Sequence, residues 1–185
     1  MSGSNAQQAA VAAVIESAVG ELDLEWQRLD DTTFAVALPG EKRLKTACLL
    51  TIGAHALNIE AFVLRAPEEQ REQVYAWLLQ RNTRMYAVSW AIDRVGDIYL
   101  TGRMPLAAVS AEELDRILGS VLEYADGAFN VLLEIGFGSS IRREWAWRVK
   151  NDQPLANLAA FAHFAQRPVD QRPVDQRPVD QLPVD

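Results

Sequence analysis

Hydrophobic positions in the first twenty residues recur at steps of three and four, the spacing of one buried face of a helix. The residues that carry this spacing are Val11, Val14, Ile15, Ala18 and Val19. A helix is therefore predicted from a cap at Ser4 or Asn5 to a stop near Gly20.

The spacing then changes to strict alternation, which is typical of half-buried strands. Alternating segments lie at about residues 22–26, 34–38, 43–52 and 56–64, and short turn sequences such as Pro39-Gly40 separate them. Because such short connections join neighbouring strands, the four segments are predicted to pair as an antiparallel meander.

The second half of the chain returns to helical spacing, interrupted by one more hairpin. A helix is predicted to start at Pro67-Glu68-Glu69 and to end at Asn82, and two strands then flank the turn at residues 93–97. A capping box at Ser110 and Glu113 opens a long apolar stripe. The segment GFGSS, residues 136–140, predicts a flexible break before two short helices at about residues 141–151 and 154–165.

This order, α-β-β-β-β-α-β-β-α-α, predicts an α+β fold in which helices pack on one face of an antiparallel sheet of about six strands. We divide the chain into an α+β domain at residues 1–136, a helical extension at 137–165 and a disordered tail at 166–185.

The middle of the chain resembles the YbjN family. The resemblance rests on EAFVLRAPEEQREQVYAWLLQRNTRMYAVSWAIDRVGDIYLTGRMPL, residues 60–106, and on SAEELDRILGSVLEYAD, residues 110–126, and it covers roughly residues 6 to 135. It implies a fold like that of type III secretion chaperones, which are small acidic proteins, often dimeric, that hold partner polypeptides in extended form. A chaperone-like or adaptor role, with no catalytic residues, follows from the resemblance as an expectation.

Net charge narrows the range of partners. The formal charge is -7, so an acidic surface is expected to disfavour nucleic acid and to be repelled by anionic membranes. The first residues lack a basic segment before their apolar stretch, and no run of 18 apolar residues occurs, so a cytoplasmic location is expected.

Candidate chemistry is sparse. His55 and His163 lie far apart in the sequence with no metal-ligand spacing around them, and Cys48 lies in an apolar strand as an inert thiol. GFGSS lacks the third glycine of a phosphate-binding loop. Acids at Glu68 and Glu69 are interpreted as first-turn residues that favour the helix dipole. We therefore expect no cofactor, no metal and no enzymatic activity.

The segment IRREWAWRVK is the candidate binding site for a protein or peptide partner. Arg142, Arg143, Trp145 and Trp147 form an aromatic-arginine cluster, and Trp and Arg dominate interface hot spots. The two tryptophans are two residues apart and cannot share one helix face, so one is expected to be buried and the other exposed. The alternative interpretation is a helix that docks back on its own sheet.

The chain closes with four near-identical units, QRPVD three times and QLPVD once, at residues 166–185. A proline in every unit excludes an α-helix, and no regular backbone gives the four valines a common face. A solvated spacer is predicted; display of a repeated motif and simple repeat expansion are both left open.

Function is predicted as a non-catalytic, chaperone-like or regulatory adaptor that is able to form a homodimer. Two alternatives stay open. One is a small-molecule sensor or enzyme with a pocket between the sheet and the late helices, and the other is a purely structural subunit.

Overall fold

The computed structural model describes residues 2–165, with side chains from Asn5 onward. The predictions for the repeat at residues 166–185 therefore lie outside the described residues. Six strands form one antiparallel sheet in the order β1-β2-β3-β4-β6-β5. Their bounds are β1 Glu25–Arg28, β2 Thr33–Pro39, β3 Lys45–Ile52, β4 Ala56–Leu64, β5 Val88–Ile92 and β6 Ile98–Pro105.

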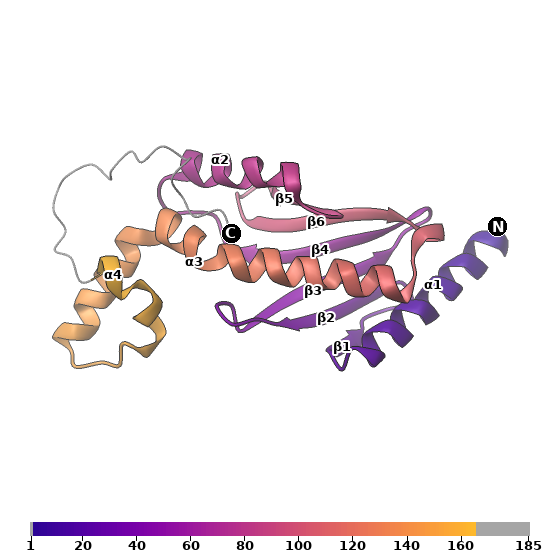
Figure 1. Cartoon of the computed structure of the whole chain (residues 1–185), viewed down its shortest axis with the longest axis horizontal. Helices are drawn as coiled ribbons and strands as arrows, with labels where there is room; N and C mark the ends of the chain where they lie inside the picture. The colour runs from indigo at the N-terminus through magenta and orange to yellow at the C-terminus, as the bar shows by residue number, and fades with distance from the viewer. Residues whose placement is uncertain (1, 166–185) are drawn as a thin grey trace.

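Helices precede, interrupt and follow these strands. The α-helices are α1 Ser2–Glu21, α2 Arg71–Arg81, α3 Ala111–Lys150 and α4 Ala162–Ala165, and the 3-10 helices are η1 Asn82–Arg84, η2 Leu106–Ala108 and η3 Ala156–Phe161. The α+β class, the six-stranded sheet and the predicted element order are confirmed. Figure 1 shows α3 running across the sheet and continuing beyond it toward α4.

One face of the sheet carries the core. The strand register places Phe34 opposite Leu50, Leu50 opposite Ile59 and Ile59 opposite Gly102, so alternate positions of β2, β3, β4 and β6 share a face. Phe34, Leu50 and Ile59 are buried under α1 and α3, which contact β3. Because side chains alternate between faces along a strand, the intervening positions point away from both helices.

Three predicted helix boundaries are wrong. The first helix starts at Ser2, before the proposed cap. α2 starts at Arg71, because Gln70 adopts a left-handed backbone (φ 49°) that stops the helix from extending back to Pro67. α3 is continuous from Ala111 to Lys150, so the predicted break at GFGSS is absent, although Ser110 caps it as expected by accepting a hydrogen bond from the Glu113 N–H.

The last predicted helix is also shorter than expected. Instead of a regular helix over residues 154–165, the chain forms η3 and then the single turn α4.

Candidate partner-binding surfaces

The loop between β4 and α2 docks on the middle of α3. The backbone N–H groups of Glu68 and Glu69 donate to the Gly136 carbonyl at 2.9 and 3.1 Å. The Glu69 carboxylate accepts hydrogen bonds from the Ser139 backbone N–H and hydroxyl, both at 2.6 Å. The Ser140 hydroxyl donates to the Glu68 carboxylate. We call this set of contacts, between Glu68 and Glu69 on the loop and Gly136, Ser139 and Ser140 on the helix, the clasp.

Small residues make the clasp possible. A Cβ at position 136 would lie 2.9 Å from the Cβ of Pro67, closer than real Cβ atoms approach, so only glycine lets the loop contact the helix there. The interpretation of Glu68 and Glu69 as first-turn acids is therefore wrong, and GFGSS is a docking site within a helix. Glycine and serine clustered inside a helical stretch are the sequence signal for this close approach.

Beyond the clasp, α3 and the residues that follow it form an arm, residues 142–165. η3 and α4 fold back on α3, where Phe161 and Phe164 are buried with their ring centroids 5.9 Å apart. The Arg142 guanidinium lies 5.2 Å from the Phe164 ring centroid, a cation–π contact. His163 Nε2 lies 3.4 Å from a carboxylate oxygen of Glu134. These contacts hold η3 and α4 against α3, and we call these two elements the hook.

The four residues predicted to bind a partner all lie on the arm, on different sides of the helix. Arg142 stacks on Phe164, and Arg143 donates to the Ser140 hydroxyl at 2.8 Å. Trp145 is half-buried against the core and Trp147 is 55% exposed, so the two tryptophans differ in exposure, although neither is buried. Their helix extends past the sheet and does not fold back on it (Figure 1). Their role in binding stays a prediction.

The second candidate surface is the sheet face that points away from the helices, which we call the outer face. From β2 to β5, one row across it consists of small or aromatic residues: Ala37, Ala47, Phe62, Tyr99 and Ala91. On β1 the row ends at Glu25, which pairs with Ala37. Ala37 pairs with Ala47, Phe62 with Tyr99, and Tyr99 with Ala91; Ala47 and Phe62 flank the paired Cys48 and Ala61. None of the five is buried. We call this the outer row.

Aromatic and charged groups surround the outer row. Phe62 and Tyr99 make an edge-to-face contact with centroids 5.5 Å apart. Partial desolvation by its neighbours raises the pKa of Tyr99, and the negative charges of Asp93, Asp97 and Glu60 raise that pKa further. The row is therefore an apolar strip with acidic groups nearby.

Arg43 connects the outer face with α3 at the end of the sheet. Its guanidinium lies 5.5 Å from the ring centroids of both Phe62 and Phe129. Burial of this half-buried side chain lowers the pKa of Arg43. Asp126 of α3 fixes the loop around it by accepting the backbone N–H groups of Lys42 and Arg43 at 2.8 and 2.9 Å.

The β5 edge of the sheet is closed by a side chain. The Asn82 amide accepts from the Trp90 N–H at 2.8 Å and donates to the Trp90 carbonyl at 3.2 Å. The amide thereby satisfies the backbone groups of Trp90 in the middle of β5, to which an added strand would otherwise pair. Asn82 was predicted only as a helix end. Its second role, pairing with Trp90, depends on how close the end of α2 lies to β5.

Reactive groups stay apart in the part of the chain that the structure describes. Cys48 is fully buried, and burial raises the pKa of its thiol to about 12, as expected for an inert core residue. His55 lies in the turn before β4, far in sequence from His163 on the arm. Between residues 2 and 165 no three His, Cys, Asp or Glu side chains are grouped to hold a metal ion, and no helix there is long and apolar enough to span a membrane.

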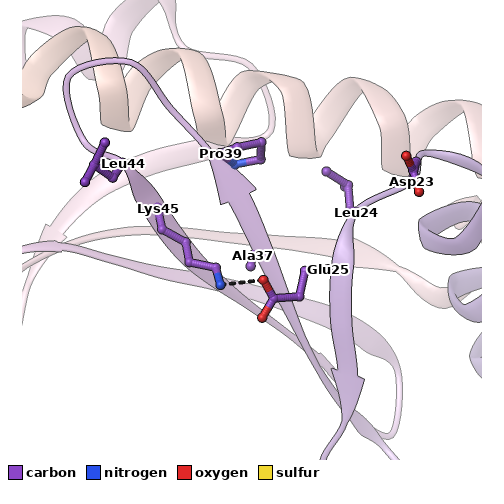
Figure 2. Close-up of a pocket in the computed structure, with 7 residues that line it drawn as sticks. All are labelled: Asp23, Leu24, Glu25, Ala37, Pro39, Leu44 and Lys45. Carbon is purple, nitrogen blue, oxygen red and sulfur yellow. Dashed lines mark hydrogen bonds and ion pairs between the residues drawn. The ribbon is translucent and has the colours of Figure 1, made fainter.

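A hollow of about 140 Å³ lies between the start of β1, the end of β2 and the start of β3 (Figure 2). A Lys45–Glu25 ion pair at 2.6 Å crosses it. The residues that line it are Asp23, Leu24, Glu25, Ala37, Pro39, Leu44 and Lys45. Typical small-molecule sites have volumes of roughly 300–1,000 Å³, so this hollow is small for one. It does not lie between the sheet and the late helices, where the alternative hypothesis of a small-molecule sensor or enzyme places a pocket.

Comparison with known proteins gives three findings. The YbjN family model, described as "Putative bacterial sensory transduction regulator", matches residues 12–134. The uncharacterized proteins Rv0487 of Mycobacterium tuberculosis and ML2442 of Mycobacterium leprae are each 56% identical to this chain over 128 residues, which are 69% of this chain and 70% of the relative.

Solved structures supply the third finding. A chain of the heterodimeric ExoU–SpcU complex, from the type III secretion system of Pseudomonas aeruginosa, aligns with a TM-score of 0.50 at 19% identity. The alignment covers 65% of this chain and 98% of that chain. The ExsC–ExsE complex aligns with a TM-score of 0.48 at 19% identity, over 66% of this chain and 92% of that chain.

Proposed function

Since the chain belongs to the YbjN family, as the sequence resemblance indicated, we propose that it is a non-catalytic protein-binding module of the cytoplasm. Its role is that of a chaperone-like or regulatory adaptor of the YbjN type. The family description as a sensory transduction regulator supports the regulatory part of this proposal. A fold shared with a chain of a secretion-system heterodimer is consistent with the chaperone-like part.

The open outer face carries the proposal. The outer row offers Phe62, Tyr99 and three alanines that a partner can cover, with a charge only at its β1 end, where Glu25 pairs with Ala37. Apolar area removed from water by a partner contributes about 25 cal/mol per Å², so a flat apolar row is a favourable place for a polypeptide to bind.

Binding on the face is favoured over strand addition at an edge. Asn82 occupies the backbone groups of Trp90 on β5. The opposite edge strand, β1, has only four residues. An added strand there would gain few backbone hydrogen bonds, whereas the face spans all six strands.

Site-specific photocrosslinking tests this proposal. A photoreactive phenylalanine analogue replaces Phe62 on the outer row in one variant and Glu123 on the exposed side of α3 in a control variant. Both variants are expressed in a mycobacterial host and irradiated, and adducts are identified by mass spectrometry. We expect the same polypeptide adducts at position 62 in repeated experiments and none of them at position 123.

Tyr99→Glu, combined with the photoreactive residue at position 62, gives a second criterion. The added charge in the outer row is expected to abolish the adducts while leaving the melting temperature nearly unchanged, because Tyr99 is not buried. An adduct between two copies of this chain would identify the outer face as a homodimer interface. Adducts at position 62 no stronger than those at position 123 would contradict the proposal.

A further inference from the structure

The exposed side of the arm carries a line of two cations and one tryptophan. Arg143, Trp147 and Lys150 follow each other at steps of four and three residues on α3, which places them on one helix face. All three are exposed, and Trp147 lies between the two cations. We call this line the basic stripe.

Internal contacts account for the neighbouring residues and leave the stripe available. Arg148 is bound to Glu144 at 2.7 Å and to the Pro154 carbonyl at 2.8 Å, and Arg142 stacks on Phe164. Within residues 2–165, Arg143 and Lys150 form no ion pair. Arg142 and Arg148 therefore stabilise the arm, whereas the basic stripe faces solvent.

Charge distinguishes the stripe from the rest of the molecule. Residues 139–150 contain four cations and one acid, Glu144, in a chain whose net charge is -7. Lys150 lies in the last turn, where the helix dipole stabilises a cation, so its position has a structural reason. Arg143 has one internal contact, the hydrogen bond to the Ser140 hydroxyl. Neither the dipole nor packing explains the exposed indole of Trp147.

From this arrangement we infer that the basic stripe binds an acidic segment of a partner protein, with carboxylates on Arg143 and Lys150 and an apolar side chain on Trp147. Charge complementarity selects this occupant, since arginine and lysine pair with carboxylates and an exposed indole gains from being covered. The inference rests on the proposed function, because it assigns the chemistry of one partner segment.

A short acidic peptide fits the stripe better than a polyanion does. Two cations can neutralise a few carboxylates at contact distance, where salt at physiological strength, with a screening length of about 8 Å, leaves the attraction intact. A nucleic acid or an anionic membrane presents charge over a much larger area and meets the acidic remainder of the chain as well.

The probe is a short fluorescein-labelled peptide rich in Glu and Leu, and binding to the full chain is followed by fluorescence anisotropy and by the change in tryptophan emission, which Trp147 is expected to dominate as an exposed indole. The test variant carries Arg143→Glu and Lys150→Glu. The control variant carries Arg84→Glu and Arg94→Glu, two exposed arginines outside the arm, and changes the net charge equally. A third variant, Arg143→Lys with Lys150→Arg, preserves the charges.

We expect saturable binding that weakens as NaCl increases. The test variant is expected to lose at least about tenfold in affinity, while the control and the charge-preserving variants stay within about twofold of wild type. Trp147→Ala is expected to weaken binding by roughly fivefold and to remove the emission change. Circular dichroism of each variant shows that the fold is intact.

Four results would overturn the inference: no saturable binding of the peptide by wild type, equal losses in the test and control variants, tighter binding of a single-stranded oligonucleotide or of phosphatidylserine vesicles, or a stripe-dependent dimer without peptide binding. A failure here leaves the crosslinks at position 62 unaffected. Absent crosslinks together with intact peptide binding would instead count against the outer face alone.

Discussion

The two ends of α3 have the same helical backbone but opposite surroundings. From Leu114 to Leu132 the helix buries one side chain per turn against the sheet and α1, and Leu114 and Leu132 are fully buried. After Ile141 no residue of α3 is buried, although the helix continues to Lys150. The first part holds the fold together, and the second carries the surface that we propose for partner binding.

The clasp lies at the boundary between the buried part of α3 and the part that projects from the sheet. Gly136, Ser139 and Ser140 are the last residues of α3 that the loop before α2 contacts through hydrogen bonds. The helix can project beyond the sheet because this loop and the hook of η3 and α4 stabilise it from two sides. A helix that leaves its sheet without such support would gain little from packing and would be marginal in water.

Truncating one side chain in each part of α3 is the strongest test of whether the two parts differ in their contribution to stability. Leu132→Ala removes a fully buried side chain and is expected to lower the free energy of unfolding by about 3 kcal/mol. Trp147→Ala removes a larger but exposed side chain and is expected to change it by less than about 0.5 kcal/mol. Urea denaturation followed by circular dichroism measures both. Similar losses for the two variants would show that the arm is part of the stabilising core.

The same substitution at two glycines of α3 tests whether the helix is closely packed at the clasp and open elsewhere. Gly136→Ala forces a Cβ to within 2.9 Å of Pro67 and is expected to destabilise the protein by about 1–3 kcal/mol. At Gly119 a Cβ meets no atom within 4 Å, so Gly119→Ala is expected to stabilise it by up to about 1 kcal/mol through helix propensity. Thermal unfolding of both variants gives the sign, and stabilisation by Gly136→Ala would refute the close approach in the clasp.

Arg142→Ala is expected to give a small effect, confined to the arm. Loss of the cation–π contact with Phe164 costs about 0.5–1 kcal/mol and acts on the hook alone. Amide hydrogen exchange in residues 156–165 is expected to become faster, while exchange in the sheet stays unchanged. Arg94→Ala, in the turn between β5 and β6, is the control. Faster exchange throughout the sheet would mean that the arm and the body unfold together.

Much of the fold was predictable from local spacing. Alternation predicted β4 at Ala56–Leu64 and placed β3, β5 and β6 within a few residues, since an apolar residue at every second position has one stable arrangement, a strand with one buried face. Ser110 and Glu113 predicted the start of α3, because the capping hydrogen bond forms within a single turn. Cys48 and the difference in exposure between the two tryptophans of the arm were likewise predictable from their immediate neighbours.

Three features could not be predicted, because each depends on a second segment far along the chain. They are the start of α2 at Arg71 and not at Pro67, the continuity of α3 through GFGSS, and the role of Asn82. Glu69 and Ser139 are 70 residues apart in the sequence, and the composition of either segment alone suggests a different structure. The sequence by itself determined which side chains must leave water and at what spacing, since burial is decided residue by residue. Only the tertiary structure decided which loop meets which helix, because a contact between distant segments forms only when both are brought within hydrogen-bonding distance. The same contacts decided that one sheet face and one helix end are not covered by any element within residues 2–165.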